Sequence, residues 1–210
     1  MNIVFANEKG GVGKSTMCAL FANYLSNKGI VVNVIDLDHQ KTLFTMRKQD
    51  SEVYDNPFPY AVEYIPPSDI VDYLVRTKDQ KDVINLYDTP ANINDENVLK
   101  LLFVADVIVI PFHYERTVVD STALLLNGIK SLMSKGCVAK LFFIPNKVKS
   151  STKFDSAQTL NELFGTYGKV TPMISDRVYI MRYSTLDITT EQSKILEPAF
   201  DVIYKGIIVK

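Results

Sequence analysis

The chain has 210 residues, a formal net charge of −1 and a hydrophobic content of 47%. This length fits one domain with a sizeable core, so we expect a single domain over residues 1–210. The balanced charge excludes a protein that attracts nucleic acid through its overall charge. No apolar run is long enough to predict a membrane-spanning helix, and two cysteines are too few for a disulfide framework. We therefore expect a cytoplasmic protein.

A glycine-rich segment follows the first predicted strand, Ile3–Ala6, and precedes a long apolar helix predicted over 14–28. In this context glycines let backbone N–H groups turn inward and cradle phosphate oxygens, while the helix N-terminus adds partial positive charge. Lys14 is expected to contact the β- and γ-phosphates, and Ser15 to give its hydroxyl to Mg²⁺. The predicted phosphate-binding residues are Gly10, Gly11, Val12, Gly13, Lys14, Ser15 and Thr16.

The sequence Lys-Gly-Gly-Val-Gly-Lys-Ser-Thr over 9–16 departs from the common phosphate-loop pattern. Glu8 stands where a glycine is usual, and a second lysine, Lys9, precedes the glycine pair. This is the deviant Walker A box, through which the chain resembles the ParA/MinD family of ATPases. The resemblance implies an α/β P-loop NTPase fold, with a mostly parallel twisted β-sheet flanked by helices on both faces. It also implies an ATP-bound homodimer in which Lys9 reaches the partner's phosphates.

The next predicted strand, Ile30–Ile35, ends in Asp36 and Asp38. In open α/β sheets ligands bind beyond the carboxyl ends of the strands, which is where both aspartates lie. The pattern is similar to the family's Asp-x-Asp-Pro-Gln box, with His39 in place of the proline. The resemblance implies that Asp38 orients the attacking water and that Asp36 belongs to the Mg²⁺ site. The alternative is that both residues only cap or solvate the strand end.

A second strand–aspartate motif occupies 82–90. Its mostly apolar strand ends in Asp88, the form of a Walker B element, and Asp88 is expected to hold Mg²⁺ directly or through water. Asp106, in contrast, precedes the predicted strand Val107–Pro111 and so lies at the opposite edge of the sheet, where we expect a structural role.

The hydrophobic pattern predicts the remaining elements between and after these motifs. A helix follows Asp38, a strand and a short helix come next, and two helices flank the strand Val107–Pro111, the second of them long. The last apolar helical face is expected to dock on the core, with an interruption or a restart at Pro198, and it is too weakly basic for a membrane-surface helix. The predicted ranges are 41–49, 61–65, 67–75, 94–102, 117–135 and 189–204.

The strand predicted over 139–144 leads to Asn146, Lys147 and Lys149. A guanine-reading loop would have an aspartate at position 149, and a lysine cannot accept the hydrogen bonds that guanine offers. The sequence therefore favours ATP over GTP. Asn146 matches the asparagine that contacts adenine in the family, although an ordinary loop asparagine is the alternative.

No acidic residue occurs between Asp120 and Asp155, although this stretch contains several lysines. Such a local excess of positive charge fits non-specific contact with DNA phosphates, and a solvated lysine face is the alternative. The resemblance implies DNA binding in this region and in the loop predicted over 175–185. The lysines are Lys130, Lys135, Lys140, Lys147, Lys149 and Lys153. The candidate DNA contacts are Lys147, Lys149, Arg177 and Arg182.

These motifs lead to one functional hypothesis. The resemblance implies a short ParA-type ATPase that partitions DNA: an ATP-bound dimer binds non-specific DNA on the nucleoid, and a ParB-like adaptor stimulates slow hydrolysis and release. A MinD-like ATPase that positions proteins or acts at a membrane is the alternative. A metal-cluster carrier of the same superfamily is disfavoured, because the sequence contains no Cys-x-x-Cys.

Overall fold

A seven-stranded sheet forms the centre of the computed structural model, which describes residues 1–55, 57–80, 82–92, 95–149, 152 and 154–208. Every strand pair is parallel, and the strand order is β3-β2-β4-β1-β5-β6-β7. The strands are β1 (Asn2–Phe5), β2 (Val31–Asp36), β3 (Ala61–Tyr64), β4 (Val83–Asp88), β5 (Val107–Phe112), β6 (Lys140–Pro145) and β7 (Lys169–Val170). The predicted parallel α/β fold is confirmed.

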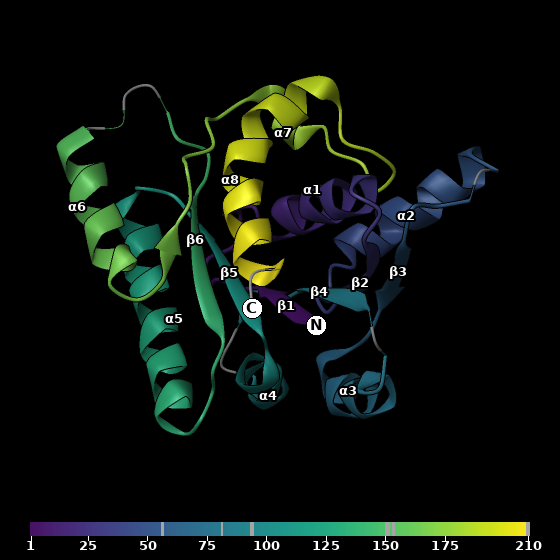
Figure 1. Cartoon of the computed structure of the whole chain (residues 1–210), viewed down its shortest axis with the longest axis horizontal. Helices are drawn as coiled ribbons and strands as arrows, with labels where there is room; N and C mark the ends of the chain where they lie inside the picture. The colour runs from purple at the N-terminus through teal and green to yellow at the C-terminus, as the bar shows by residue number, and fades with distance from the viewer. Residues whose placement is uncertain (56, 81, 93–94, 150–151, 153, 209–210) are drawn as a thin grey trace.

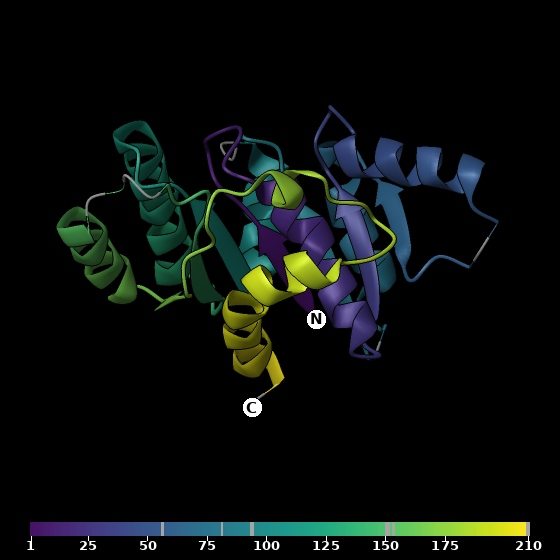
Figure 2. The ribbon, with the colours of Figure 1, turned by 90° about the horizontal axis from the view of Figure 1, so that it is seen from above.

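Helices cover both faces of this sheet (Figures 1 and 2). Core contacts place α1, α7 and α8 on one face and α3, α4, α5 and α6 on the other, while α2 adds Leu43 to the α1 side. The helices are α1 (Lys14–Asn27), α2 (Thr42–Val53), the 3₁₀ turn η1 (Pro67–Asp69), α3 (Ile70–Thr77), α4 (Glu96–Val104), α5 (Arg116–Ser134), α6 (Phe154–Gly165), α7 (Val178–Met181) and α8 (Thr190–Ile208).

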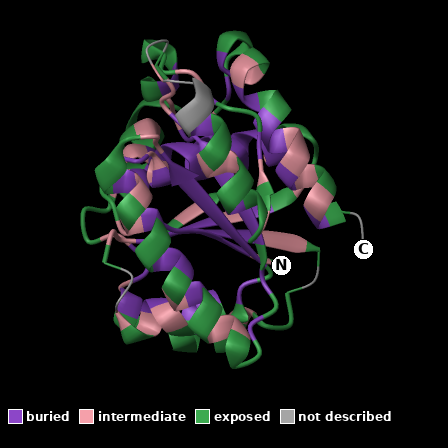
Figure 3. Cartoon of the chain, turned by 90° about the vertical axis from the view of Figure 1, so that its left-hand side faces the viewer, coloured by how far each residue is buried: buried purple, intermediate pink, exposed green. Residues whose placement is uncertain are grey.

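The sequence of β1 explains why the sheet has two buried faces. Ile3 and Phe5 pack with α1 and α8, whereas Val4 packs into the core beneath α3, α4 and α5. A strand buried on both faces is continuously apolar, as a parallel strand with helices above and below must be. Figure 3 shows the central strands largely buried, with exposed residues mainly on the outer helix surfaces and the connecting loops.

Helix α8 docks on α1, as the sequence predicts. The Phe200 ring lies 5.1 Å from the Phe21 ring and 5.5 Å from the Tyr24 ring, both in edge-on geometry. However, α8 continues through Pro198 without interruption. Proline removes one backbone N–H and costs an interior helix about 3 kcal/mol, and here the burial of Leu196 and Phe200 on either side offsets that cost.

Other differences from the sequence prediction are local. Helix α2 extends to Val53 rather than residue 49, and the expected loop over 175–185 contains the short helix α7. The pattern also missed α6 and β7, which complete the far edge of the sheet. Residues 94 and 153, which the sequence places in a helix and in the lysine-rich stretch, lie outside the described residues. Within the described residues, no helix is long and apolar enough to cross a membrane.

Candidate functional site

The candidate site lies where three neighbouring strands end. In the strand register Phe5 of β1 is paired with Asp88 of β4, and Asp88 is paired with Asp36 of β2. The glycine-rich loop leaves β1 at the same edge and leads into α1. The sheet therefore brings the three sequence motifs that precede residue 90 to one place, as expected for ligand sites in open α/β sheets.

Two glycines give the loop a backbone shape that other residues rarely adopt. Gly11 has φ 78° and Gly13 has φ 100°, both in the left-handed region. A Cβ atom on Gly13 would also lie 2.4 Å from the Asn146 side-chain nitrogen. Gly13 is the N-cap of α1 and offers no side-chain oxygen to the N–H groups of the first turn. These N–H groups can therefore face an anion.

Asn7 attaches the start of the loop to β5 and α5. Its side-chain amide donates to the Pro111 carbonyl at 2.9 Å and to the Thr122 hydroxyl at 3.0 Å, and its Oδ1 accepts from the Lys9 N–H at 3.2 Å. Asn7 was not among the residues that the sequence motifs predicted for the site. Its position directly after an apolar strand is the only signal that the sequence offered.

Two consecutive residues after β6 hold the loop from its other side. Asn146 Nδ2 donates to the Val12 carbonyl at 2.8 Å, and Lys147 Nζ donates to the Gly11 carbonyl at 2.7 Å. Lys147 is itself in the left-handed region, with φ 49°. Fixing these two carbonyls fixes the orientation of the adjoining peptides, and so of the N–H groups that face the opposite way. Asn146 Oδ1 is buried without a hydrogen-bond partner among the described residues.

The two lysines of the loop have different environments. Lys14 is 7% exposed, and its Nζ donates to the Lys9 carbonyl at 3.3 Å. Burial lowers the pKa of Lys14, and the negative charges of Asp88 and Asp38 oppose this shift. Lys9 is exposed at the outer rim of the loop. Lys14 thus points inward toward the aspartates, while the Lys9 side chain is accessible from outside.

Asp88 is the most unusual group of the site. It is completely buried, and neither carboxylate oxygen has a hydrogen-bond partner among the described residues. The pKa of Asp88 is raised to about 7: burial is the main cause and the charges of Asp36 and Asp38 add to it, whereas the nearby Ser15 hydroxyl and Lys14 ammonium oppose it. The Ser15 hydroxyl is close enough to lower the pKa of Asp88, although its geometry does not meet the criteria for a hydrogen bond. A buried carboxylate without partners fits a bound cation, which would satisfy both oxygens.

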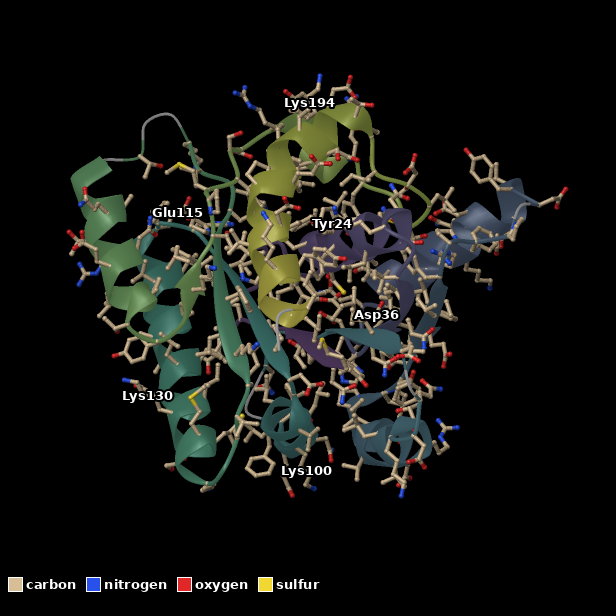
Figure 4. The ribbon with its side chains drawn as sticks, in the orientation of Figure 1. Tyr24, Asp36, Lys100, Glu115, Lys130 and Lys194 are labelled. Atoms are coloured by element: carbon tan, nitrogen blue, oxygen red, sulfur yellow. The ribbon has the colours of Figure 1, made fainter. Side chains whose placement is uncertain are left out.

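Asp36 differs from Asp88 because its carboxylate is already satisfied. Its oxygens accept hydrogen bonds from the N–H groups of Asp38 at 3.1 Å, Leu43 at 3.0 Å and Phe44 at 3.1 Å. Burial nevertheless raises the pKa of Asp36, against these three hydrogen bonds. Asp36 therefore caps the first turn of α2 from the end of β2, and it is labelled within the body of the molecule in Figure 4. Its predicted contact with Mg²⁺ stays a prediction.

Asp38 occupies the loop between β2 and α2. Its Oδ1 accepts from the Gln40 N–H at 3.0 Å, and its carbonyl accepts from the Lys41 N–H at 2.8 Å. The residue is half-buried, and its charge acts on both Lys14 and Asp88. The structure therefore places Asp38 beside the phosphate loop, on a turn that its own side chain helps to hold.

The four candidate DNA contacts divide into two groups. Lys147 is engaged with the loop carbonyl of Gly11, and Lys149 lies 3.4 Å from the Glu115 carboxylate. Arg177 and Arg182 flank helix α7 and are exposed, with no ion pair or side-chain hydrogen bond to another described residue. The two arginines are therefore the more available cations.

Comparisons with known proteins agree with this geometry. Residues 3–184 match the family model described as the CobQ/CobB/MinD/ParA nucleotide binding domain. A putative plasmid partition protein from Borrelia burgdorferi B31, solved with AMPPNP, is similar to this chain with 22% identity and a TM-score of 0.74, covering 98% of both chains. The ATP complex of an McdA variant from Cyanothece has 18% identity and a TM-score of 0.76, covering 100% of this chain and 96% of its own.

MinD from Aquifex aeolicus, a cell division protein, is also similar, with 16% identity, a TM-score of 0.69 and coverage of 100% and 97%. No curated protein matches the sequence. At these identities the solved structures establish the fold, while the family match extends over most of the chain.

A glycine exchange tests the loop geometry. We expect Gly13→Ala to lower the free energy of unfolding by more than the roughly 1–2 kcal/mol that a left-handed backbone alone costs, because the new methyl group also meets Asn146. Gly10→Ala is the control, since a Cβ there has no neighbour within 4 Å and no left-handed φ is involved. Urea unfolding measures both variants. Equal stability of the two variants would contradict the assigned loop shape.

Asp88→Asn tests the buried carboxylate through pH. An aspartate with a pKa of about 7 in the folded protein and 3.8 as its ordinary value binds more protons when folded than when unfolded between these pH values. Wild-type stability must therefore fall, relative to Asp88→Asn, as the pH rises from about 4 to about 7. Thermal unfolding without nucleotide or metal, at several pH values, measures the difference. A stability difference that does not change with pH would be evidence against the perturbed carboxylate.

Proposed function

This chain belongs to the family of CobQ/CobB/MinD/ParA nucleotide-binding domains, and we propose that it is a Mg²⁺-dependent ATPase of the ParA/MinD type that partitions DNA. The observation that carries the ATPase proposal is the buried, unpartnered carboxylate of Asp88, which faces Lys14 beneath a glycine loop. A cation and a phosphate chain would together satisfy groups that the protein leaves without partners. The solved relatives with AMPPNP and with ATP support the choice of nucleotide.

The proposed binding step uses backbone and charge together. The loop N–H groups and the first turn of α1 receive the phosphates, with Gly10 and Gly11 allowing close approach and Thr16 closing the first helical turn. Lys14 contributes its charge to the β- and γ-phosphates. Ser15 and Asp88 would hold Mg²⁺, while Asp36 orders the adjacent loop, and a bound ion would supply positive charge to the phosphate oxygens. Asn146 remains the candidate contact for adenine, near the Val12 carbonyl that it already binds.

The proposed hydrolytic step needs two further residues. Asp38 lies on the loop beside the phosphate site and orients the attacking water. Lys9 is exposed at the loop rim, so it is positioned to reach the nucleotide of a second copy in an ATP-bound homodimer. Because nucleotide would connect the two copies, ATP acts as a switch between monomer and dimer.

The proposed DNA-binding surface centres on Arg177 and Arg182, which flank α7. Arg177 and Met181 of this segment line one pocket with Thr16 and Asn146 of the nucleotide site. Both guanidinium groups are available to phosphates without breaking an ion pair or a side-chain hydrogen bond between described residues. A contact through phosphates alone reads no sequence, which suits a protein that moves over DNA. A ParB-like adaptor would then stimulate hydrolysis and release.

The two loop lysines should separate in a kinetic test. Lys9→Ala is expected to abolish hydrolysis while the monomer still binds ATP, because Lys9 acts on the partner's nucleotide. Lys14→Ala is expected to weaken both binding and hydrolysis. Titration with a fluorescent ATP analogue and a phosphate-release assay measure the two steps. Normal turnover by Lys9→Ala would disprove the role of this lysine across the dimer.

DNA binding should depend on the arginines. We expect Arg177→Ala and Arg182→Ala to weaken binding of random duplex DNA in the presence of ATP. Each should also reduce the log–log salt slope by about 0.9 for every DNA phosphate that the protein no longer neutralises. Lys149→Ala is the comparison, because that lysine is already paired with Glu115. The Asp38→Ala protein, expected to remain an ATP-bound dimer, provides the reference state in gel filtration.

An ATP-dependent dimer that retains DNA, with slow turnover that responds to DNA, would support the partition role. A dimer that ignores DNA at low salt, but sediments with lipid vesicles in ATP, would instead assign the protein to the MinD-like alternative.

A further inference from the structure

A groove of about 770 Å³ lies between α3 and α4 and reaches the end of α5. We call it the α3–α4 groove. It lies on the sheet face opposite α1, and none of the described residues that line it belongs to the nucleotide site. Figure 1 shows α3 and α4 side by side below the sheet, next to the lower end of α5. The groove needs an explanation of its own.

Helix α3 has two apolar faces. Ile70 and Tyr73 point into the core, where they are 0% and 5% exposed. A second face, spaced i, i+3, i+4 and i+7, lines the groove and consists of Val71, Leu74, Val75 and Lys78. Leu74 packs partly against the core, but Val71 is 37% and Val75 is 60% exposed, so the outer part of this face is left uncovered.

Helix α4 repeats the same arrangement. Val98, Leu101 and Leu102 are fully buried, whereas the residues spaced i, i+3, i+4 and i+7 from Glu96 turn toward the groove. This second face contains Glu96, Leu99, Lys100 and Phe103. The Phe103 ring is 39% exposed. On α4 this face is mixed, with Leu99 and Phe103 between the charged Glu96 and Lys100. Together with Val71, Leu74 and Val75 of α3 they form an exposed apolar floor, and a surface of this kind is normally covered by a further element.

The charged residues around the α3–α4 groove indicate which kind of element would cover it. Lys78 caps the C-terminus of α3 and Lys135 caps the C-terminus of α5, and neither forms an ion pair with a described residue. Lys100, labelled in Figure 4, lies 2.8 Å from Glu96, the only acidic side chain among the described residues that line the groove. Cations at helix C-termini are favourable by themselves, but here their side chains also surround an exposed apolar surface.

We propose that the α3–α4 groove binds an acidic amphipathic helix of a partner protein. The apolar floor would take anchors spaced i, i+3 or i+4, and i+7, and the lysines would pair with flanking carboxylates. Helix α4, with 9 residues, is roughly 14 Å long, so the bound segment needs only two to three turns. A concave surface between two helices suits a helix better than a flat bilayer, which favours a convex apolar face.

A displayed library of random 16-residue peptides tests the proposal with the intact protein. Selection on the wild type, with counter-selection on Val75→Asp, is expected to enrich peptides with Leu, Ile or Phe at helical spacing and Asp or Glu beside them. Leu124→Asp is the matched control, because Leu124 is also helical and 60% exposed but lies outside the groove. Absence of enrichment, or enrichment of basic peptides, would overturn the proposal.

The enriched peptide, synthesised with a fluorophore, then gives affinities by anisotropy. We expect at least tenfold weaker binding to Val75→Asp and to the pair Lys78→Glu and Lys135→Glu, and unchanged binding to Leu124→Asp and to Lys194→Glu on α8. Thermal unfolding and ATP-analogue binding, equal to wild type, confirm that the variants fold.

Loss of peptide binding in all four proteins would overturn the assignment to the groove. Two other results would also overturn it, provided that Val75→Asp abolishes them. Binding of oleate or sedimentation with anionic vesicles would assign the groove to a lipid, and self-association without nucleotide would assign it to a second copy of the chain.

Discussion

The rest of the site depends on one electrostatic interaction, which is that between the buried side chains of Lys14 and Asp88. Burial disfavours the charged form of each residue, and their attraction offsets only part of that cost. The protein therefore holds an amine and a carboxyl group, each less inclined to ionise than in water, at a buried place where Asp88 has no hydrogen bond from a described residue. Such an arrangement costs stability in the isolated protein and is favourable for a ligand that brings its own phosphates and metal ion.

The surrounding fold maintains that costly arrangement from several directions. Asn7 attaches the loop to β5 and α5, while Asn146 and Lys147 hold two consecutive loop carbonyls from the end of β6. Asp36 fixes the start of α2 and so the loop that carries Asp38. The contacts of Asn7, Asn146 and Lys147 join segments more than 100 residues apart, and they leave N–H groups of the loop free to face the same place.

The same construction separates two surfaces. The nucleotide site and the two exposed arginines lie at the carboxyl edge of the strands, near α1 and α7. The α3–α4 groove lies on the opposite sheet face and has its own charge pattern. One surface would bind nucleotide and DNA, and the other a protein helix, so a partner at the groove need not compete for the phosphate loop.

The sequence by itself determined the parallel α/β fold, the phosphate loop and the strand-terminal aspartates, because strand periodicity and glycine–lysine spacing are local properties of the chain. It also distinguished Asp106, which accepts the Asn2 N–H at the far edge, from Asp88. Only the tertiary structure decided that Asp36 caps a helix, that Lys147 holds the loop, and that α8 passes unbroken through Pro198. The Lys147 contact depends on a partner 136 residues away. The capping by Asp36 was one of two alternatives until the turn after β2 was known, and the unbroken α8 depends on the burial of Leu196 and Phe200 against the core.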